Sequence, residues 1–298
     1  MEHKVNAHVI VIGAVNMDIC GSPSRTLISR DSNPGSVSMS VGGVGHNIAV
    51  DLKRLGLEVS LIAATGGDIY GEGLLKSCLD DGLDMSLARY VPGKRSSSYL
   101  YINDEKGDLA LAVCDTDIAE SIDADYLSGL LDEINTADAL VIDGNLPEET
   151  LCWIGENVTV PLYADPVSVT KSSRLRAILP KLTAIKPNDL EAMHMTGEDS
   201  PEKAAAALIK AGVKRVFISL GKKGILAAGE GKSILCPPCA AELCNTAGAG
   251  DAVTAAIVWA GLRGLTLEDT ALAANKAAAI AIACELPISP ALCEEKIL

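Results

Sequence analysis

Short apolar runs rich in β-branched residues alternate with helical patterns along most of this 298-residue chain. Such runs are typical of buried strands, and the amphipathic stretches between them are typical of crossover helices. The strand-like runs are 8–15, 59–66, 137–144, 161–166, 182–188 and 215–221, and the helical stretches are 46–56, 71–82, 148–158, 172–182, 200–212 and an alanine-rich final third. The alternation predicts an α/β fold with a mainly parallel sheet and helices on both faces, whose ligands bind at the carboxyl ends of the strands.

Two segments interrupt this alternation. Residues 22–41 are polar and turn-rich, and residues 96–113 show a hairpin pattern with its turn near 103–107. Neither fits a crossover helix, so we expect antiparallel strands that leave the main sheet and form a lid. An edge extension without a gating role is the alternative. Because no linker separates two halves of the sequence, we predict a single domain over residues 1–298, with lid segments at about 22–41 and 96–113.

The acidic composition limits the partners. A formal net charge of −14 repels nucleic acid and anionic membranes, so we expect neither as a partner. It leaves room for an anionic ligand, because backbone N–H groups make a site locally positive.

Nine cysteines without a signal peptide favour a reducing compartment, and we predict a cytoplasmic protein. Cys236 and Cys239 form a lone C-x-x-C without a second pair at zinc spacing, so a structural role is favoured over a metal or redox role.

The stretch NTAGAGDA (245–252) places two glycines and an acid immediately before an apolar helical run. Gly248 and Gly250 permit a tight turn and close ligand approach, so the N–H groups of residues 248–251 can converge on one anion. Asp251 beside such an anion hole can take a proton from a hydroxyl while the hole holds a phosphate. The spacing alone leaves a second interpretation open, in which Asp251 only complements the helix dipole.

Four other small-residue motifs follow predicted strands or open a helix. They are GAVNMD (13–18), VGGVGHNIA (41–49), KPNDLE (186–191) and SLGKKG (219–224). Asn16 and Asp18 stand at the carboxyl end of the first predicted strand, and Asn188 and Glu191 stand three residues apart after a later one. Each motif alone is a weak signal, since glycine-rich strand ends are common in α/β proteins, but together and in this order they are specific.

In this combination the motifs resemble those of the PfkB, or ribokinase-like, family of carbohydrate and nucleoside kinases. GGVGHNIAVDLKRLG (42–56) and NTAGAGDA are similar to the two signatures of that family, and the resemblance covers nearly the whole chain. It implies a ribokinase-like three-layer αβα sandwich with a small β lid. It also implies an ATP-dependent transfer of phosphate to a sugar hydroxyl, with Mg²⁺ as the metal cofactor and a small molecule as the acceptor.

Within this family, the resemblance is strongest to members that phosphorylate the 5′-hydroxyl of pseudouridine. The motifs that carry it are DSNPG (31–35), GGVGHNIA (42–49), SSSYL (96–100), NLPEE (145–149), ADPVS (164–168) and KPNDLE (186–191). Kinases of the adenosine, inosine or ribose type are the alternative within the family. A non-catalytic, nucleoside-binding relative is the alternative from another class, and the intact Asp251, Asn188 and Glu191 argue against it.

The resemblance also implies roles for individual residues. Asp251 corresponds to the catalytic base, and Gly248, Ala249 and Gly250 complete the anion hole with it. The implied substrate-binding residues are Asn16, Asp18, Gly43, Asn47, Ser97 and Asn145. The implied nucleotide-binding residues are Asn188, Ser219, Gly221 and Asn275, and Glu191 is the implied magnesium residue, acting through water because Mg²⁺ keeps several of its waters.

Three positions depart from the pattern of the family. Val44 stands where ribose-specific members carry lysine, which weakens an assignment to free ribose. His46 stands where relatives often carry arginine or alanine, and it is equally well interpreted as a surface helix residue, so it is left out of the site. Asn245 stands where many relatives carry aspartate, which leaves open whether K⁺ binds beside the anion hole.

The lid is the expected source of base specificity. Pseudouridine differs from uridine by a carbon–carbon glycosidic bond that leaves one more ring N–H free. With the sugar held from below, we expect the acceptor for that N–H on the lid, among residues 31–33 or 96–99. Residues 31–33 precede Pro34-Gly35, so they also fit a purely turn-forming role. A small sheet with one exposed apolar face further favours a homodimer formed through the lid.

Overall fold

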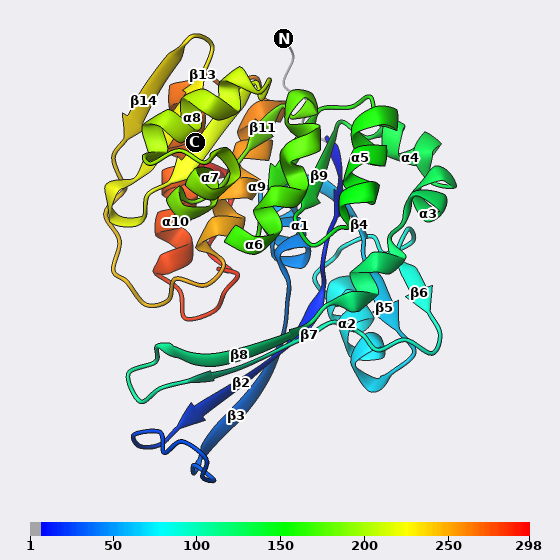
Figure 1. The fold of residues 1–298 in the computed structure, drawn as a ribbon, viewed down its shortest axis with the longest axis vertical. Helices are drawn as coiled ribbons and strands as arrows, with labels where there is room; N and C mark the ends of the chain where they lie inside the picture. Colours follow the sequence, from blue (N-terminus) through cyan, green and yellow to red (C-terminus); the bar gives the residue numbers. More distant parts are fainter. Residues whose placement is uncertain (1–6) are drawn as a thin grey trace.

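The computed structural model describes residues 7–298 and is built on one large sheet (Figure 1). The expectation that no targeting signal precedes the first strand falls largely on residues 1–6, which lie outside the described residues. The order of the eight strands is β14 (Lys232–Cys236), β13 (Ile225–Gly229), β12 (Arg215–Ser219), β11 (Ala184–Ile185), β10 (Leu162–Asp165), β9 (Ala139–Asp143), β1 (His8–Ile12) and β4 (Glu58–Ile62). The strands from β12 to β4 are parallel, so the predicted mainly parallel sheet is confirmed.

Helices cover both faces of this sheet, because its buried strands are apolar on both sides. In β1, Val9 and Val11 join one core cluster while Ile10 and Ile12 join the other. The first face is covered by α1 (Val44–Arg54), α2 (Ile69–Asp80), α9 (Ala249–Leu262), α10 (Leu267–Ile282) and α11 (Glu294–Ile297). The second is covered by η1 (Asp117–Ser121), α3 (Ala124–Ser128), α4 (Leu131–Thr136), α5 (Glu148–Asn157), η2 (Ser173–Lys181), α7 (Asp189–Thr196) and α8 (Pro201–Lys210). The predicted three-layer αβα sandwich is therefore confirmed. Within residues 7–298, no helix has the length and apolarity needed to cross a bilayer.

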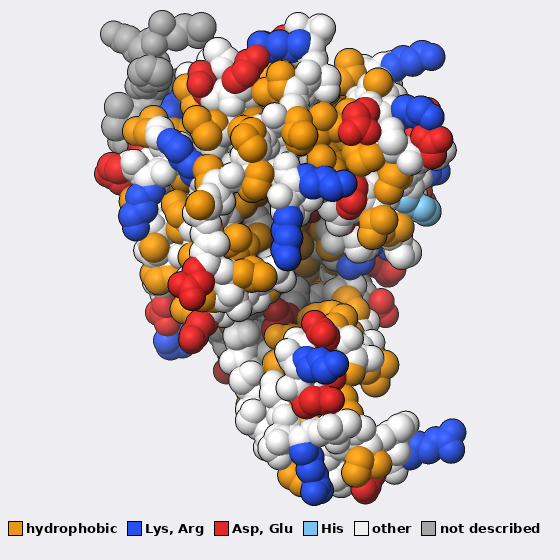
Figure 2. Space-filling view, turned by 90° about the vertical axis from the view of Figure 1, so that its left-hand side faces the viewer, with side chains coloured by type: hydrophobic (Ala, Val, Ile, Leu, Met, Phe, Trp, Pro, Cys, Tyr) orange, Lys and Arg blue, Asp and Glu red, His pale blue; other side chains and the backbone are white. Residues whose placement is uncertain are grey.

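A second sheet of four strands extends from the body as an arm (Figures 1 and 2). Its strands are β3 (Gly35–Gly42), β2 (Asn16–Pro23), β7 (Ser98–Asn103) and β8 (Leu109–Asp115), in that order. We call this sheet the lid. It unites the two segments that break the sequence alternation, but it begins at Asn16 rather than at 22. The two hairpins are antiparallel as expected, whereas β2 and β7 pair in parallel.

The two faces of the lid differ in polarity, because successive side chains of a strand point to opposite faces. In register across the lid, Met39, Ile19, Leu100 and Val113 share one face. This apolar face also carries Val37, Ile102 and Leu111, and Val37, Met39, Leu100, Leu111 and Val113 are exposed. The opposite face carries Asp18, Ser38, Ser40, Tyr99 and Tyr101, with the two tyrosine rings stacked 5.3 Å apart.

Several local predictions differ from the structure. The predicted strand 59–66 is divided into β4 and β5 (Ala64–Gly66), and β5 turns away to pair with β6 (Arg89–Val91). The predicted helix 172–182 is the short α6 (Val169–Ser172) followed by 3₁₀ turns, since Pro180 has no N–H for an α-helical bond. The antiparallel β13–β14 hairpin was not predicted. Its signal was the turn at Glu230-Gly231, where both φ angles are positive, as a type I′ hairpin requires.

Candidate active site

Asp251 lies in the first turn of α9, which follows a glycine whose backbone leaves no room for a side chain. Gly248 caps the helix with φ at +75°, and a Cβ there would lie 1.8 Å from the carbonyl oxygen of Pro287. The first amides of a helix have no acceptor in a preceding turn. The amide of Ala249 makes only a long 3.4 Å bond to the carbonyl of Thr246. The N–H groups of residues 249–251 can therefore bind an anion beside the Asp251 carboxyl.

Asn47 fixes the Asp251 side chain from across the fold. Its Nδ2 donates to Oδ2 of Asp251 at 2.8 Å, although the two residues are 204 positions apart. Helix α1 can approach this closely because it begins behind Gly43, whose φ is +102°. A Cβ on Gly43 would lie 2.4 Å from the carbonyl oxygen of Ala14 and 2.7 Å from Oδ1 of Asn16. The two glycine-rich motifs of the sequence therefore meet at one place.

Asp18 and Asn16 stand at the base of the lid, on the strand β2, and the Asn16 amide donates to the Asp18 carboxyl. A Cβ on Gly42 would collide with that carboxyl, at 2.2 Å. Burial raises the pKa of Asp18 to about 6, although the bond from Asn16 and the nearby His46 lower it. Sequence reasoning assigned both residues to the end of the first strand. That strand ends at Ile12, and the chain re-enters a strand at Asn16 as part of the lid.

Below Asp251 lies a buried charged network that sequence reasoning missed. Lys186 Nζ is 3.0 Å from Oδ2 of Asp165, and the same oxygen accepts from Thr254 Oγ1 at 2.8 Å. Asp143 accepts from the amide of Ala14 at 2.9 Å. The available signal was position, since Asp143 and Asp165 are the last residues of β9 and β10 and Lys186 follows β11. Neighbouring parallel strands bring their carboxyl ends to one edge.

These surroundings bring the pKa of Asp251 close to neutral pH, which suits it to act as a base. Burial and the neighbouring charge of Asp165 raise the pKa of Asp251 to about 7, with a smaller contribution from Asp143. The bond from Asn47 and the ammonium of Lys186 act in the opposite direction. A carboxylate with a pKa near the working pH is suited to accept a proton from a hydroxyl.

A second buried acid lies one helical turn beyond Asn47. Asp51 is 1% exposed, and among residues 7–298 neither of its carboxyl oxygens has a hydrogen-bond partner. Burial raises its pKa well above the usual range, and the charge of Asp251 adds to this. The native state therefore holds this proton at pH values where the unfolded chain has lost it.

We expect Asp51→Asn to stabilise the protein increasingly as pH rises. Between the unfolded pKa of about 3.9 and the raised folded pKa, one extra bound proton weakens folding by ~1.4 kcal/mol per pH unit. The amide removes this dependence. Urea unfolding of both proteins at pH 5 and pH 8 measures it, with exposed Asp132→Asn as the control. A constant difference between the two pH values would contradict a buried protonated acid.

Three of the four predicted nucleotide residues, Asn188, Ser219 and Gly221, lie at the ends of β11 and β12. Asn188 and Ser219 form an isolated parallel bridge, and Gly221 follows in the short η3 (Gly221–Lys223) with φ at +56°. Asn188 also caps α7 in a capping box, in which Glu191 Oε2 accepts from the Asn188 amide at 2.8 Å. Asn275 is buried on α10, and its amide donates to the carbonyls of residues 236 and 237, both at 3.1 Å. It thus holds the loop after β14 in place.

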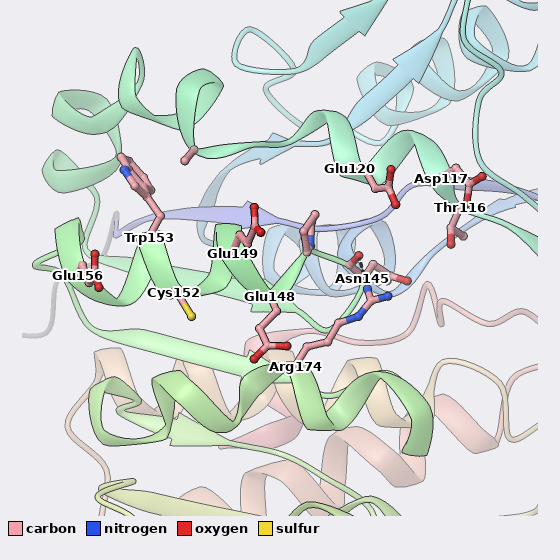
Figure 3. A pocket seen from close by; sticks show the side chains of 12 residues that line it. Thr116, Asp117, Glu120, Asn145, Glu148, Glu149, Cys152, Trp153, Glu156 and Arg174 are labelled. Carbon is pink, nitrogen blue, oxygen red and sulfur yellow. Dashed lines mark hydrogen bonds between the residues drawn. The ribbon is translucent and has the colours of Figure 1, made fainter.

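Ser97 and Asn145 lie where the lid meets the body. Ser97 is buried and its carbonyl accepts from Met17 on β2 at 2.9 Å. Asn145 donates to Asp143 at 3.0 Å and accepts from Lys171. Asn145 also lines a cavity of about 860 Å³ that runs along α5 (Figure 3). Its other lining residues are Thr116, Asp117, Glu120, Ala124, Pro147, Glu148, Glu149, Cys152, Trp153, Glu156 and Arg174.

The chain matches known proteins along almost its whole length. The profile of the family described as pfkB family carbohydrate kinase matches residues 6–292. Pseudouridine kinase of Escherichia coli (strain K12) is 34% identical over 292 residues, which cover 96% of this chain and 93% of that protein. Among solved structures, a carbohydrate kinase from Agrobacterium tumefaciens is 29% identical with a TM-score of 0.84, covering 98% of this chain and 95% of its own.

A more distant structure supports the fold. Ribokinase of Arabidopsis thaliana, complexed with ribose and ATP, is 21% identical with a TM-score of 0.85 and covers 98% of this chain and 97% of its own. The family match spans the lid, which holds Asp18, and the helices α1 and α9, which hold Asn47 and Asp251. The chain belongs to the pfkB family of carbohydrate kinases.

Proposed function

We propose that this protein transfers the terminal phosphate of ATP to the 5′-hydroxyl of pseudouridine. The observation that carries the proposal is the 34% identity to the Escherichia coli pseudouridine kinase over 96% of the chain. The buried Asp251 beside the helix N-terminus supplies chemistry suited to that reaction. The alternative is another pfkB sugar or nucleoside kinase, favoured by the similarity to a ribokinase fold with bound ribose and ATP.

In the proposed reaction, Asp251 accepts the proton of the 5′-hydroxyl as the oxygen attacks the terminal phosphorus. The bond from that phosphorus to the bridging oxygen breaks, and ADP leaves with the electron pair. The N–H groups of residues 249–251 lie where negative charge gathers on the transferred group, so they stabilise the transition state. Asn47 orients the base through its 2.8 Å bond. Asn16 and Asp18 offer donors and acceptors for the ribose diol.

The residues around Asn188 fit a Mg²⁺ ion bound mainly through water. Glu191 is buried, its Oε2 is held by the Asn188 amide, and both residues supply the hard oxygen atoms that Mg²⁺ prefers. When bound, the ion neutralises phosphate charge. Whether a K⁺ ion binds beside the anion hole stays open. The side chain of Asn245 is bonded to the backbone: its Oδ1 accepts from the Ala247 amide at 3.0 Å, and its Nδ2 donates to the Glu285 carbonyl at 2.9 Å.

Two of the lid residues that were expected to contact the nucleobase, Asn33 and Ser96, instead bond to other groups of the protein. Asn33 bonds the backbone of Ile28 at 2.8 and 3.0 Å, which favours the turn-forming role of residues 31–33. Ser96 donates to Asp68 at 2.7 Å and accepts from the Gly66 amide. We infer that base recognition falls to Tyr99 on the polar face of the lid and to the end of the cavity near Asn145 and Thr116.

A panel of acceptors tests the function. Purified protein with ATP and Mg²⁺ is given pseudouridine, uridine, adenosine, inosine or ribose, and ADP release and phosphorylated product are measured. We expect the highest kcat/KM with pseudouridine and a preference over uridine of about 5- to 150-fold, which corresponds to one unpaired buried acceptor. A higher kcat/KM with ribose or adenosine would contradict the proposal and identify that compound as the preferred acceptor.

The pKa of Asp251 predicts the pH dependence of the reaction. The base works only when ionised, and its pKa is raised to about 7. We therefore expect kcat/KM to rise about tenfold per pH unit below pH 7 and to level off above it, since this profile reports groups of the free enzyme. Initial rates in buffers from pH 5 to pH 9 measure it. An acid limb near pH 4 would mean that Asp251 titrates as an ordinary carboxyl.

We further propose that the protein is a homodimer joined through its lid. The apolar face of the lid leaves Val37, Met39, Leu100, Leu111 and Val113 exposed side by side. A continuous apolar surface of this kind is typical of an interface. Figure 2 shows hydrophobic side chains at the surface of the projecting lid. A second copy of the chain can cover this face with its own.

Val113→Asp is expected to convert the dimer into monomers, because it places a charge on the apolar face of the lid, on the edge strand β8. Light scattering coupled to size-exclusion chromatography gives the mass directly. Ser38→Asp is the matched control, since Ser38 is also exposed on the lid but lies on its polar face. A wild-type mass of one chain at micromolar concentration would refute the dimer.

A further inference from the structure

Lys186 is a buried lysine placed directly below the anion hole. It is 7% exposed and follows β11 at the carboxyl edge of the sheet. A Cβ on Gly250 would lie 2.9 Å from its Nζ. Because Gly250 has no side chain, that space is open, and the ammonium lies close to the amides of the hole. Lys186 and its partner Asp165 belong to the motifs KPNDLE and ADPVS, but sequence reasoning assigned neither residue a role of its own.

The position of this ammonium is fixed by Asp165. A buried charge is tolerated only when it is paired and hydrogen-bonded. Asp165 Oδ2 lies 3.0 Å from Lys186 Nζ and accepts from Thr254 Oγ1 at 2.8 Å. Thr254 belongs to α9, one turn beyond Gly250, and its hydroxyl also lies 3.2 Å from the Gly250 carbonyl. The pair is thus tied to the helix that carries both the base and the hole.

The charges that face Asp251 come from four elements. Asp165 on β10 and Asp143 on β9 raise its pKa, whereas Lys186 after β11 and the amide of Asn47 on α1 lower it. Asp51, also on α1, is held in its protonated form by its own burial. Asp165 and Lys186 therefore change the pKa of Asp251 in opposite directions, although they lie 3.0 Å apart and are both buried.

We propose that Lys186 and Asp165 form a charge pair that positions positive potential under the anion hole and tunes Asp251 as the base of the proposed phosphate transfer. Lys186 is a positioning residue in this inference, which rests on the proposed function. Its ammonium favours the negative charge that gathers on the transferred phosphoryl group. Asp165 keeps the ammonium buried and prevents Asp251 from becoming too weak a base.

Two nearly isosteric variants separate this role from a structural one. With the acceptor that the wild-type protein turns over best, Lys186→Met should lower kcat by about 10²-fold while leaving the KM of the acceptor unchanged. The acid limb of kcat/KM against pH should move up by about one pH unit in Lys186→Met. In Asp165→Asn it should move down by about as much. A structural role predicts falls in kcat and Tm for both variants without opposite shifts, and that result would overturn the proposal.

The titration of Asp251 can also be followed without turnover. In protein labelled with ¹³C at aspartate carboxyl carbons, the Asp251 signal is assigned by its loss in Asp251→Asn. Its midpoint should rise in Lys186→Met and fall in Asp165→Asn, while exposed Lys203→Met should leave it unchanged. Equal midpoints in all four proteins would refute the charge pair. Opposite midpoint shifts in a protein that phosphorylates no acceptor would uphold the pair and refute the proposed function.

Discussion

Replacing Asp251 by asparagine is expected to lower kcat by ~10²- to 10⁴-fold, the range for loss of a general base. The fold should survive, because the asparagine Oδ1 can still accept the 2.8 Å bond from Asn47 that orients this side chain. Nucleoside affinity should also survive, since Asn16 and Asp18 are untouched. Single-turnover kinetics with saturating ATP would measure the chemical step, and calorimetry would measure nucleoside binding.

Asp132→Asn is a suitable control for the Asp251 experiment. Asp132 is an exposed acid on α4, distant in the sequence from every candidate site residue, and its variant should keep wild-type rates. If Asp251→Asn transferred phosphate at the wild-type rate, another group would have to accept the proton. Asp18, with a pKa raised to about 6, would then be the first to examine.

Gly248→Ala is expected to reduce kcat by ~10²- to 10³-fold, comparable with the loss of one oxyanion donor. The new Cβ would lie 1.8 Å from the Pro287 carbonyl oxygen, so the first turn of α9 must move. Its amides then no longer converge on the phosphate. The positive φ adds strain of about 1–2 kcal/mol for a residue with a Cβ. Steady-state kinetics and thermal unfolding of the same preparation would separate the two effects.

Gly264→Ala provides the matched control for this strain. Gly264 has a φ of +66°, close to the +75° of Gly248, but a Cβ there would meet nothing within 4 Å. Both variants should lose similar stability from the positive φ, Gly248→Ala should lose more in total because of its collision with Pro287, and only Gly248→Ala should lose activity. Equal kinetic losses in the two variants would mean that the position of the α9 N-terminus does not matter for transfer.

The sequence predicted most of the central sheet because each buried strand is a continuous apolar run bounded by turn residues. The glycine pattern before α9 drew attention to Asp251, and the resemblance to the family signatures pointed to Asn47 and Gly43. The lid was found as an interruption of the pattern, but its start was misplaced. The apolar run from His8 continues past Gly13 to Val15, so that one glycine is the only mark of the break between β1 and β2 in the sequence.

What sequence reasoning missed depends on contacts between distant strands. Asp143, Asp165 and Lys186 belong to separate strand ends, and none of them lies in the two glycine-rich signatures. Their importance comes from the order of β9, β10 and β11 in the sheet, which a single sequence does not give. Asn275 illustrates the same limit. Helical spacing places it on α10, but only the fold shows that it clamps the loop after β14.

The bond between Asn47 and Asp251 also has a consequence for how the protein is made. Its two partners are 204 residues apart, so a ribosome must synthesise most of the chain before they can meet. Contacts of such sequence separation form late and slow folding. A nascent chain that ends before α9 would present the strands from β1 to β14 with one face lacking α9, α10 and α11, three of the five helices that cover it in residues 7–298. That intermediate exposes apolar surface and is the species most prone to aggregate or to require a chaperone.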